Sequence, residues 1–498
     1  MLLRHSCSRS STPLSWFSRR SAVAMPLCAK VINPAFAGHS RMSTIAEIPK
    51  DLAGDDPDDV LFNSVFGVRT IELNRPTKLN SLNGSMARKI IPRLKEWEKS
   101  QLANIIMISG TGDKAFCAGG DVAVITQQNM EGPEGQQKSI DFFALEYRLD
   151  HLVATYTKPY IAVMDGITMG GGVGLSVHAP FRIATERTVF AMPETTIGFF
   201  PDVGGSFFLS RLDGETGTYL GLTSERLTGV QTFYAGIATH YLHSSVLGNL
   251  TARLSELVFK DYASLRERLE IVNKTMAEFS TGLPSVNEER IHLAGTLRRS
   301  VDRCFKHNTI EDILEALKQE TENKEWAEKT LKTLSSRSPT ALKVTLRQLR
   351  LGRKWSISEA FQREHHIAAH FMKHPDFTEG VKARLLSKPS TQPIWQPDTL
   401  EAVTSKDVDF FLTIPEDQTR LPLLSSVDYP AYPHAHYSLP SEAEIEKFVR
   451  DNSISRKQTV NEFFRKWGQK EGVREKVAEV LARRTAQTPE GLRWVEEL

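Results

Sequence analysis

The amino-acid sequence predicts an α/β fold in the first half of the chain, followed by a mainly helical region. Two observations support this fold class. Short apolar runs rich in β-branched residues alternate with segments of helical period as far as Asp202, and beyond that residue the helical period dominates. With 498 residues, 40% of them hydrophobic and 24% charged, the chain has the composition of a soluble globular protein of two or three domains.

The charge balance and the hydropathy argue against two classes of protein. A formal net charge of +2 argues against a polyanion-binding surface spread over the whole chain. No apolar run reaches the ~20 residues that a transmembrane helix needs. We therefore expect no membrane association.

Residues 1–46 differ from the rest of the chain. Their basic residues lie among many serines, and no acidic residue precedes Glu47. This pattern is typical of a mitochondrial presequence, so the expected location is the mitochondrial matrix, and a disordered basic tail is the alternative. Two of the four cysteines fall in this segment, and the remaining Cys117 and Cys304 are too few and too far apart for a disulfide framework or a metal cluster.

The first elements after the presequence have clear patterns. Two β-rich runs within Val60–Leu73 predict a hairpin. A helical pattern over Met86–Trp97 follows, with Asn83 or Ser85 as its N-cap. Pro92 lies inside this pattern and argues against an unbroken helix.

Two glycine-rich segments each follow a predicted strand. The first ends at Asp121, after the buried strand Ile105–Ile108, and by itself indicates only a turn between a strand and a helix. The second follows the strand Tyr160–Met164, where four glycines between Gly170 and Gly174 open a predicted helix. Glycine is a costly choice in a helix, so we expect the backbone there to approach another group closely. The free N–H groups of a helix start also favour negative charge.

Three acidic residues follow or border apolar segments. Glu146 borders the apolar face of a helix predicted over Ser139–Leu152, where a solvent-exposed edge position is the commoner explanation. Glu194 follows Pro193 and an apolar run, so burial would raise its pKa, and Asp202 could hold a second proton. Two backbone N–H groups from the glycine loops could polarise a carbonyl group while a carboxylate attacks it or activates a water.

The second half of the chain contains helical segments such as Ile310–Leu317. Prolines cluster within residues 389–397 and again within 422–440, which indicates linkers. Ser441–Leu498 is predicted to form two or three charged helices. These helices are locally basic, for which a solvated face is the commoner explanation.

Six motifs occur along the chain in a recognisable order. They are LNRPTKLNSLN (Leu73–Asn83), KAFCAGGDV (Lys114–Val122), ITMGGGVGLSVH (Ile167–His178), FAMPETTIGFFPDVGG (Phe190–Gly205), SPTALKVTLRQL (Ser338–Leu349) and DFTEGVKARLL (Asp376–Leu386). Together they resemble the crotonase superfamily of enoyl-CoA hydratases and isomerases, over about residues 59–412. The resemblance implies a crotonase-like spiral of ββα units that binds an acyl-CoA. Because CoA is then part of the substrate, no separate cofactor and no metal is implied.

The same resemblance implies roles for individual residues. The backbone N–H groups of Gly120 and Gly171 would hold the thioester carbonyl, and Glu194 and Asp202 would be the catalytic carboxylates. The residues implied to line the acyl pocket are Glu146, Gly171, Glu194 and Asp202, and those implied to contact CoA are Lys78, Ala118 and Asp121.

One departure from the pattern separates activities within the superfamily. Enoyl-CoA hydratases carry a glutamate in a G-G-G-x-E pattern, where this chain has Gly174. The chain also resembles the 3-hydroxyacyl-CoA hydrolases of the superfamily in carrying Asp202. The resemblance therefore implies hydrolysis of the thioester of 3-hydroxyisobutyryl-CoA, and of 3-hydroxypropionyl-CoA as a second substrate, in valine catabolism. An enoyl-CoA hydratase or isomerase is an alternative.

The segment after Leu412 extends beyond this resemblance. The predicted division of the chain is a presequence over 1–46, an acyl-CoA-binding core over 47–285, a helical region completing it over 286–412, a linker over 413–440 and a helical extension over 441–498. Some mitochondrial ribosomes resemble this case in carrying a hydrolase-like protein in their small subunit. Association with a mitochondrial ribosome, through docking of the extension on RNA or protein, is therefore a second function to test. The sequence leaves open whether the chain forms a homo-oligomer.

Overall fold

The described part of the chain begins at Ala46. The computed structural model describes residues 46–285, 289, 291–489 and 491–496. The predicted presequence lies outside these residues except for Ala46. The described residues belong to one unit of internal contacts, and the domain boundaries predicted within it stay predictions. None of the described helices is long and apolar enough to cross a membrane.

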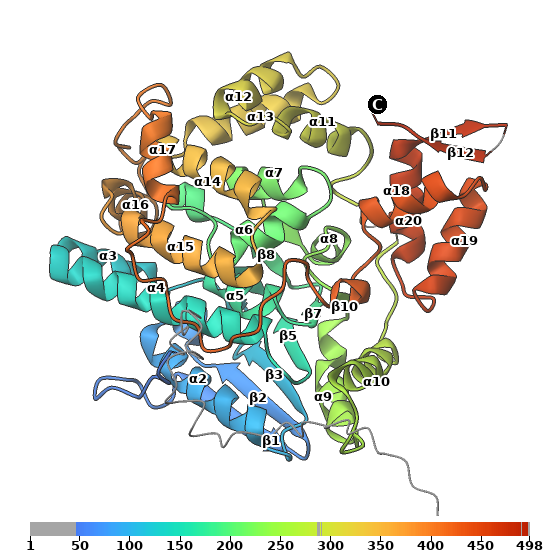
Figure 1. Cartoon of the computed structure of the whole chain (residues 1–498), viewed down its shortest axis with the longest axis horizontal. Coiled ribbons are helices and arrows are strands. Elements are labelled where there is room, and N and C mark those ends of the chain that lie inside the picture. Colours follow the sequence, from blue (N-terminus) through green and yellow to red (C-terminus); the bar gives the residue numbers. More distant parts are fainter. Residues whose placement is uncertain (1–45, 286–288, 290, 490, 497–498) are drawn as a thin grey trace, which may run out of the picture. The chain divides into compact units, whose positions relative to one another are not determined.

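A six-stranded sheet forms one layer of the fold (Figure 1). Its strand order is β1-β2-β3-β5-β7-β10, and all neighbours are parallel except β1 and β2. The antiparallel pairing of β1 with β2 confirms the predicted hairpin. β5 is buried along its whole length, as its continuous apolar sequence predicts for a parallel strand covered on both faces. The strands are β1 (Val60–Val65), β2 (Val68–Leu73), β3 (Ile105–Gly110), β5 (Tyr160–Met164), β7 (Phe181–Ala184) and β10 (His240–Tyr241).

A second sheet of four short strands brings three loops to one edge. β4, β6 and β8 are parallel neighbours, and β9 pairs antiparallel with β8. The chain repeatedly passes from the first sheet to the second and then into a helix, as in β3-β4-α3 and β5-β6-α5, which gives the predicted ββα units. Because the carboxyl ends of parallel neighbours share an edge, the segments after β4, β6 and β8 meet there. These elements are β4 (Ala115–Cys117), β6 (Ile167–Met169), β8 (Val189–Ala191), β9 (Leu227–Thr228), α3 (Val122–Met130) and α5 (Gly171–Val177).

Helix α2 (Gly84–Lys99) shows packing overriding a local signal. The Asn83 side chain accepts a hydrogen bond from the Met86 amide at 2.8 Å, which confirms Asn83 as the N-cap. The predicted helix is confirmed, and α2 continues through Pro92 even though this proline argued against an unbroken helix. A proline inside a helix costs about 3 kcal/mol. Burial of the apolar face around Ile91 offsets that cost.

Helix α15 (Ile357–Phe371) of the second half packs against α4 (Pro133–Ala154), which contains the predicted helix Ser139–Leu152 (Figure 1). The rings of Tyr147 and Phe361 are 6.2 Å apart, so α15 lies along α4. The helices after β8 are α6 (Gly205–Phe208), α7 (Thr216–Thr223), α8 (Val230–Tyr234), α9 (Leu247–Ser255), α10 (Leu265–Ala277), α11 (Gly295–Phe305), α12 (Ile310–Gln319), α13 (Lys324–Ser335), α14 (Pro339–Gly352), α15 (Ile357–Phe371), α16 (Pro375–Val381) and α17 (Ser405–Leu412).

The described residues of the C-terminal extension, 441–489 and 491–496, form three helices and a hairpin (Figure 1). The predicted charged helices are confirmed. The hairpin was not predicted, because its two strands are short and carry few apolar residues. Val477 and Trp494 of the extension share an apolar cluster with Phe233 of the core. The elements are α18 (Glu442–Asp451), α19 (Arg456–Lys466), α20 (Val473–Arg484), β11 (Thr485–Thr488) and β12 (Gly491–Trp494).

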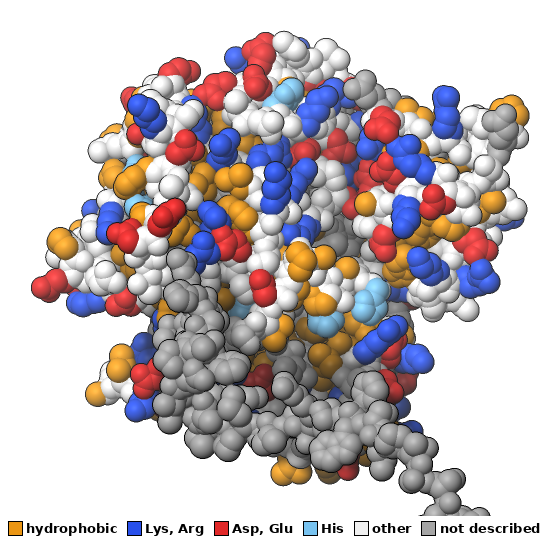
Figure 2. Space-filling view, viewed as in Figure 1, with side chains coloured by type: hydrophobic (Ala, Val, Ile, Leu, Met, Phe, Trp, Pro, Cys, Tyr) orange, Lys and Arg blue, Asp and Glu red, His pale blue; other side chains and the backbone are white. Residues whose placement is uncertain are grey.

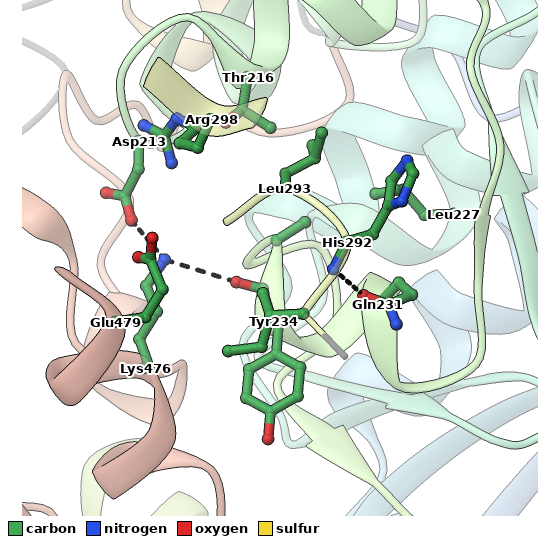
Figure 3. A pocket seen from close by; sticks show the side chains of 12 residues that line it. Asp213, Thr216, Leu227, Gln231, Tyr234, His292, Leu293, Arg298, Lys476 and Glu479 are labelled. Carbon is green, nitrogen blue, oxygen red and sulfur yellow. Dashed lines mark hydrogen bonds and ion pairs between the residues drawn. The ribbon is translucent and has the colours of Figure 1, made fainter. Parts of the chain in front are cut away.

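Ion pairs hold the C-terminal extension against the core. Lys476 Nζ lies 2.8 Å from Asp213 Oδ2, and Figure 3 shows these side chains pointing toward one another. Glu442 Oε2 accepts from both Arg483, at 2.7 Å, and Arg298, at 3.2 Å. The space that Asp213, Arg298 and Lys476 help to enclose is about 20 Å³, which is room for one water and none for a substrate. This region is therefore a contact between the C-terminal extension and the core, and not a binding site.

The replacement Gly174→Ala should destabilise the protein by about 1–3 kcal/mol, because an alanine Cβ there would lie 2.5 Å from Asp150 Oδ2 in a packed interior. The matched control is Gly248→Ala in α9, where the new methyl group meets open space. The better helix propensity of alanine should raise the free energy of unfolding of this variant by up to about 1 kcal/mol. Urea unfolding midpoints measure both changes. Equal midpoints for the two variants would contradict the packing argument.

Candidate active site

A cavity of about 480 Å³ lies at the edge where β4, β6 and β8 end. Its volume falls in the range of sites for small molecules and cofactors. Segments of both glycine-rich stretches and the 3₁₀ turn after β8 form its walls. The predicted site residues that line it are Ala118, Gly120, Glu146, Gly171, Glu194 and Asp202.

The amide groups of Gly120 and Gly171 lie close together in this cavity. A side-chain carbon placed on Gly171 would be 3.4 Å from the Gly120 amide nitrogen. Gly171 is the first residue of α5, where amides have no acceptor within the helix. Across the described residues, neither of the two N–H groups donates to a backbone oxygen. Two adjacent unpaired N–H groups can together bind one carbonyl oxygen.

The glycines of α5 allow carboxylates to approach its backbone. A Cβ on Gly171 would overlap Glu146 Oε1, and a Cβ on Gly170 would lie 3.1 Å from Glu194 Oε1. The predicted close approach of this backbone to another group is therefore confirmed, and the approaching groups are acidic side chains. The run of glycines thus creates the space in which the acids of the cavity sit.

Three carboxylates of the cavity are almost fully buried. Glu146, Glu194 and Asp202 are 2%, 5% and 4% exposed. Burial, followed by the nearby charge of Asp202, holds the pKa of both Glu146 and Glu194 well above the usual range. Burial raises the pKa of Asp202 to about 7, although a hydrogen bond from Tyr147 opposes the rise. At neutral pH the cavity therefore holds protonated as well as ionised acids, which suits proton transfer.

A strained turn carries Asp202 into the cavity. The next two residues, Val203 and Gly204, have φ values of 51° and 84°, and a positive φ is rare for a β-branched residue. The Glu364 carboxylate accepts hydrogen bonds from the Gly204 amide at 2.6 Å and the Ser206 amide at 2.9 Å. These contacts from α15 hold the turn in place.

Tyr147 on α4 completes the support of Asp202. Its hydroxyl donates to Asp202 Oδ2 at 2.7 Å. Neither Tyr147 nor Glu364 was predicted from the sequence, because each lies far from Asp202 along the chain and no local pattern marks it. A tyrosine on the apolar face of a helix has the same pattern as an ordinary core residue.

Two predicted CoA-contacting residues lie outside the cavity lining. Lys78 ends a short 3₁₀ turn, Pro76–Lys78, and is exposed. The Asp121 carboxylate pairs with Arg75 Nη2 at 2.8 Å. Their role in CoA binding stays a prediction. Within the described residues, no group of three or more His, Cys, Asp or Glu side chains is arranged to hold a metal ion.

Comparison with known proteins identifies the family. Residues 68–412 match the enoyl-CoA hydratase/isomerase family, over more than half of the chain. The chain belongs to this family. The structure of a carnitinyl-CoA dehydratase from Mycobacterium thermoresistibile aligns with a TM-score of 0.62 and 32% identity, over 74% of this chain and 98% of that one. The predicted crotonase-like fold is thus confirmed for this family member.

The relatives of this family member include small ribosomal subunit proteins and mitochondrial hydrolases. The small ribosomal subunit protein mS47 of Neurospora crassa is 51% identical over 96% of each chain. The mitochondrial 3-hydroxyisobutyryl-CoA hydrolase of Gallus gallus is 42% identical over 71% of this chain and 89% of its own. The mS47 protein of Schizosaccharomyces pombe is 41% identical over 74% of this chain and 83% of its own.

The variant Tyr147→Phe should raise the pKa of Asp202, because the lost hydroxyl stabilises the ionised carboxylate. A hydrogen bond to a charged group is worth about 1.5–3 kcal/mol, which corresponds to about one to two pH units. Carboxyl carbon NMR of aspartate-labelled protein would follow the titration. Tyr156→Phe is the matched control, because the Tyr156 hydroxyl donates to the Leu94 carbonyl at 2.8 Å and not to Asp202. An unchanged titration of Asp202 in Tyr147→Phe would rule out the coupling between Tyr147 and Asp202.

Proposed function

We propose that this protein hydrolyses the thioester of 3-hydroxyisobutyryl-CoA to the free acid and CoA in the mitochondrial matrix. The observation that carries the proposal is the pair of unpaired amides, Gly120 and Gly171, in one cavity with the buried acids Glu194 and Asp202. The mitochondrial hydrolases among the relatives support both the reaction and the location. By the same reasoning 3-hydroxypropionyl-CoA is a second substrate.

The proposed reaction uses each of these groups once. The two amides bind the thioester oxygen and stabilise the negative charge that develops on it. The ionised form of Glu194, whose Oε2 has no hydrogen-bond partner among the described residues, attacks the carbonyl carbon or removes a proton from a water that attacks it. A C–O bond forms, the C–S bond breaks, and Asp202 supplies a proton to the departing thiolate or orients the 3-hydroxyl group. Where Glu194 itself attacks, the product of this step is a mixed anhydride, and water then hydrolyses it to release the free acid and restore the Glu194 carboxylate.

A hydratase is the weaker alternative for a steric reason. The enoyl-CoA hydratases that this chain resembles have a glutamate at the position of Gly174. Here any side chain at that position would meet both carboxylate oxygens of Asp150, at 2.5 and 2.8 Å. The chain therefore lacks the second glutamate that would add water to a double bond, and the position of Gly174 has no room for one.

Assembly into a ribosomal small subunit is a second candidate function, and the C-terminal extension favours it. The alignment with the Neurospora crassa mS47 protein covers 96% of this chain, whereas the family match ends at residue 412. Exposed basic residues of α19, such as Lys457 and Lys466, offer contacts to RNA phosphates. Figure 2 shows both signs of charge interspersed over the viewed face of the extension, so docking would use a local group of contacts. The buried acids of the cavity are compatible with both functions in one protein.

For the enzymatic proposal, Glu194→Gln should lower kcat for 3-hydroxyisobutyryl-CoA by about 10²–10⁴-fold, because glutamine neither attacks a thioester nor accepts a proton. Release of the free CoA thiol measures this change in kcat. In a separate assay, the wild-type protein should not hydrate crotonyl-CoA. The control is Glu96→Gln, which alters an exposed ion pair with Arg93. Wild-type turnover by Glu194→Gln would remove this residue from the mechanism.

For the assembly proposal, the native protein should cosediment with small ribosomal subunits from a mitochondrial lysate at low salt and dissociate as the salt concentration rises. The charge reversals Lys457→Glu and Lys466→Glu together should weaken cosedimentation. Glu194→Gln serves as the control because it leaves the surface unchanged. A peak at the mass of the free protein under every condition would exclude ribosome association.

A further inference from the structure

The cavity has chemically distinct ends. Its closed end holds Glu146, Glu194 and Asp202, all at most 5% exposed. Its open end includes Leu385, which is 53% exposed, and Arg226, which is also exposed. A ligand that fills the cavity therefore has one end among acids and the other end near solvent.

Three arginines line the same cavity, and sequence analysis predicted none of them. Arg226 precedes β9, Arg337 lies between α13 and α14, and Arg384 lies in the π-helical turn Lys382–Leu386. π-helical turns occur frequently at functional sites. The helical second half of the chain thus contributes two of the three positive charges.

None of the three arginines forms an ion pair with any residue that the structure describes. Arg337 Nη2 donates to the Thr223 carbonyl at 2.8 Å, and Arg384 Nη2 donates to Gln392 Oε1 at 3.0 Å. The Nε atoms of both arginines are buried and have no hydrogen-bond partner. Burial and then the charge of Arg384 lower the pKa of Arg337 to about 10. The two guanidinium groups therefore repel one another and lack a counter-charge.

We propose that Arg226, Arg337 and Arg384 bind the phosphate groups of the CoA part of the substrate. This inference rests on the proposed function and adds the residues that recognise the carrier. Guanidinium groups bind phosphate through paired charge-assisted hydrogen bonds, and a phosphate would supply the counter-charge that these arginines lack. An anionic acyl group is disfavoured at the closed end, because the ionised forms of its three acids would repel it. The neutral thioester enters that end, and the phosphates stay at the open end with the arginines.

The experiment compares substrates with and without phosphates. Arg337→Gln and Arg384→Gln, alone and together, should raise KM for the acyl-CoA, by about 10- to 100-fold for the double variant, since each charged hydrogen bond contributes strongly. KM for the corresponding acyl-pantetheine thioester, which lacks phosphates, should not change. Arg347→Gln is the matched control, because Arg347 is exposed on α14 and does not line the cavity.

Calorimetric titration with CoA itself provides a measurement that does not depend on turnover. The double variant should bind CoA about 10- to 100-fold more weakly than the wild type. Titration with dephospho-CoA, which lacks the 3′-phosphate, distinguishes the phosphates. If the double variant loses as much affinity for dephospho-CoA as for CoA, the arginines bind the diphosphate. If its affinity for dephospho-CoA equals that of the wild type, they bind the 3′-phosphate.

The outcomes separate this inference from the proposed function. If no acyl-CoA is hydrolysed but the double variant loses CoA binding, the arginine site stands and the hydrolase proposal fails. If the double variant binds CoA and turns over acyl-CoA as the wild type does, the arginine site is wrong. An equal rise of KM for acyl-CoA and acyl-pantetheine would also overturn it, because the arginines would then act only on the fold.

Discussion

The absence of side chains along one face of α5 is the constraint on which the site depends. Glu146, Asp150 and Glu194 approach the backbone of this helix at positions where a Cβ would collide or crowd. A helix this rich in glycine loses about 1 kcal/mol per glycine relative to alanine. The chain tolerates that cost because α5 is fully buried between β5 and α4 and needs little propensity of its own. The same missing side chains leave the Gly171 amide open to a ligand.

Burial gives the carboxylates their chemistry. An exposed glutamate is ionised at neutral pH, whereas the acids of this cavity share a small, poorly solvated space in which simultaneous ionisation is unfavourable. Tyr147 and Glu364 favour particular positions and charge states within that group. The support reaches the cavity from α4 and α15, so the helical second half contributes to the site even where it does not touch the ligand.

The sequence predicted the parts of the fold that local patterns determine. The hairpin, the strand Tyr160–Met164 and the Asn83 cap follow from alternation, apolar runs and capping chemistry. Short strands such as β9 and β11 carry too few residues for a pattern, and they form because a neighbouring strand offers hydrogen bonds. The continuity of α2 through a proline depended on burial that only the tertiary structure provides.

The candidate site was predictable to the extent that its residues lie in motifs. Gly120, Gly171, Glu194 and Asp202 occur in dense, ordered stretches and line one cavity. Arg337 lies in the connection between α13 and α14, and Arg384 lies inside the DFTEGVKARLL motif, but no local pattern marks either side chain as a ligand-binding group. Their significance lies in what they lack, namely a carboxylate partner, and a missing partner cannot be read from a linear sequence.

The ion pairs of Asp213 and Glu442 between the core and the C-terminal extension affect how the chain could be shortened. Removing the C-terminal extension would take Lys476 from Asp213 and Glu442 from Arg298, while the pair of Arg298 with Asp302 at 3.0 Å would remain. Breaking a buried ion pair by removing one partner costs about 3–5 kcal/mol, so truncation at the end of the family match should destabilise the core. The extension and the core should therefore unfold as one cooperative unit.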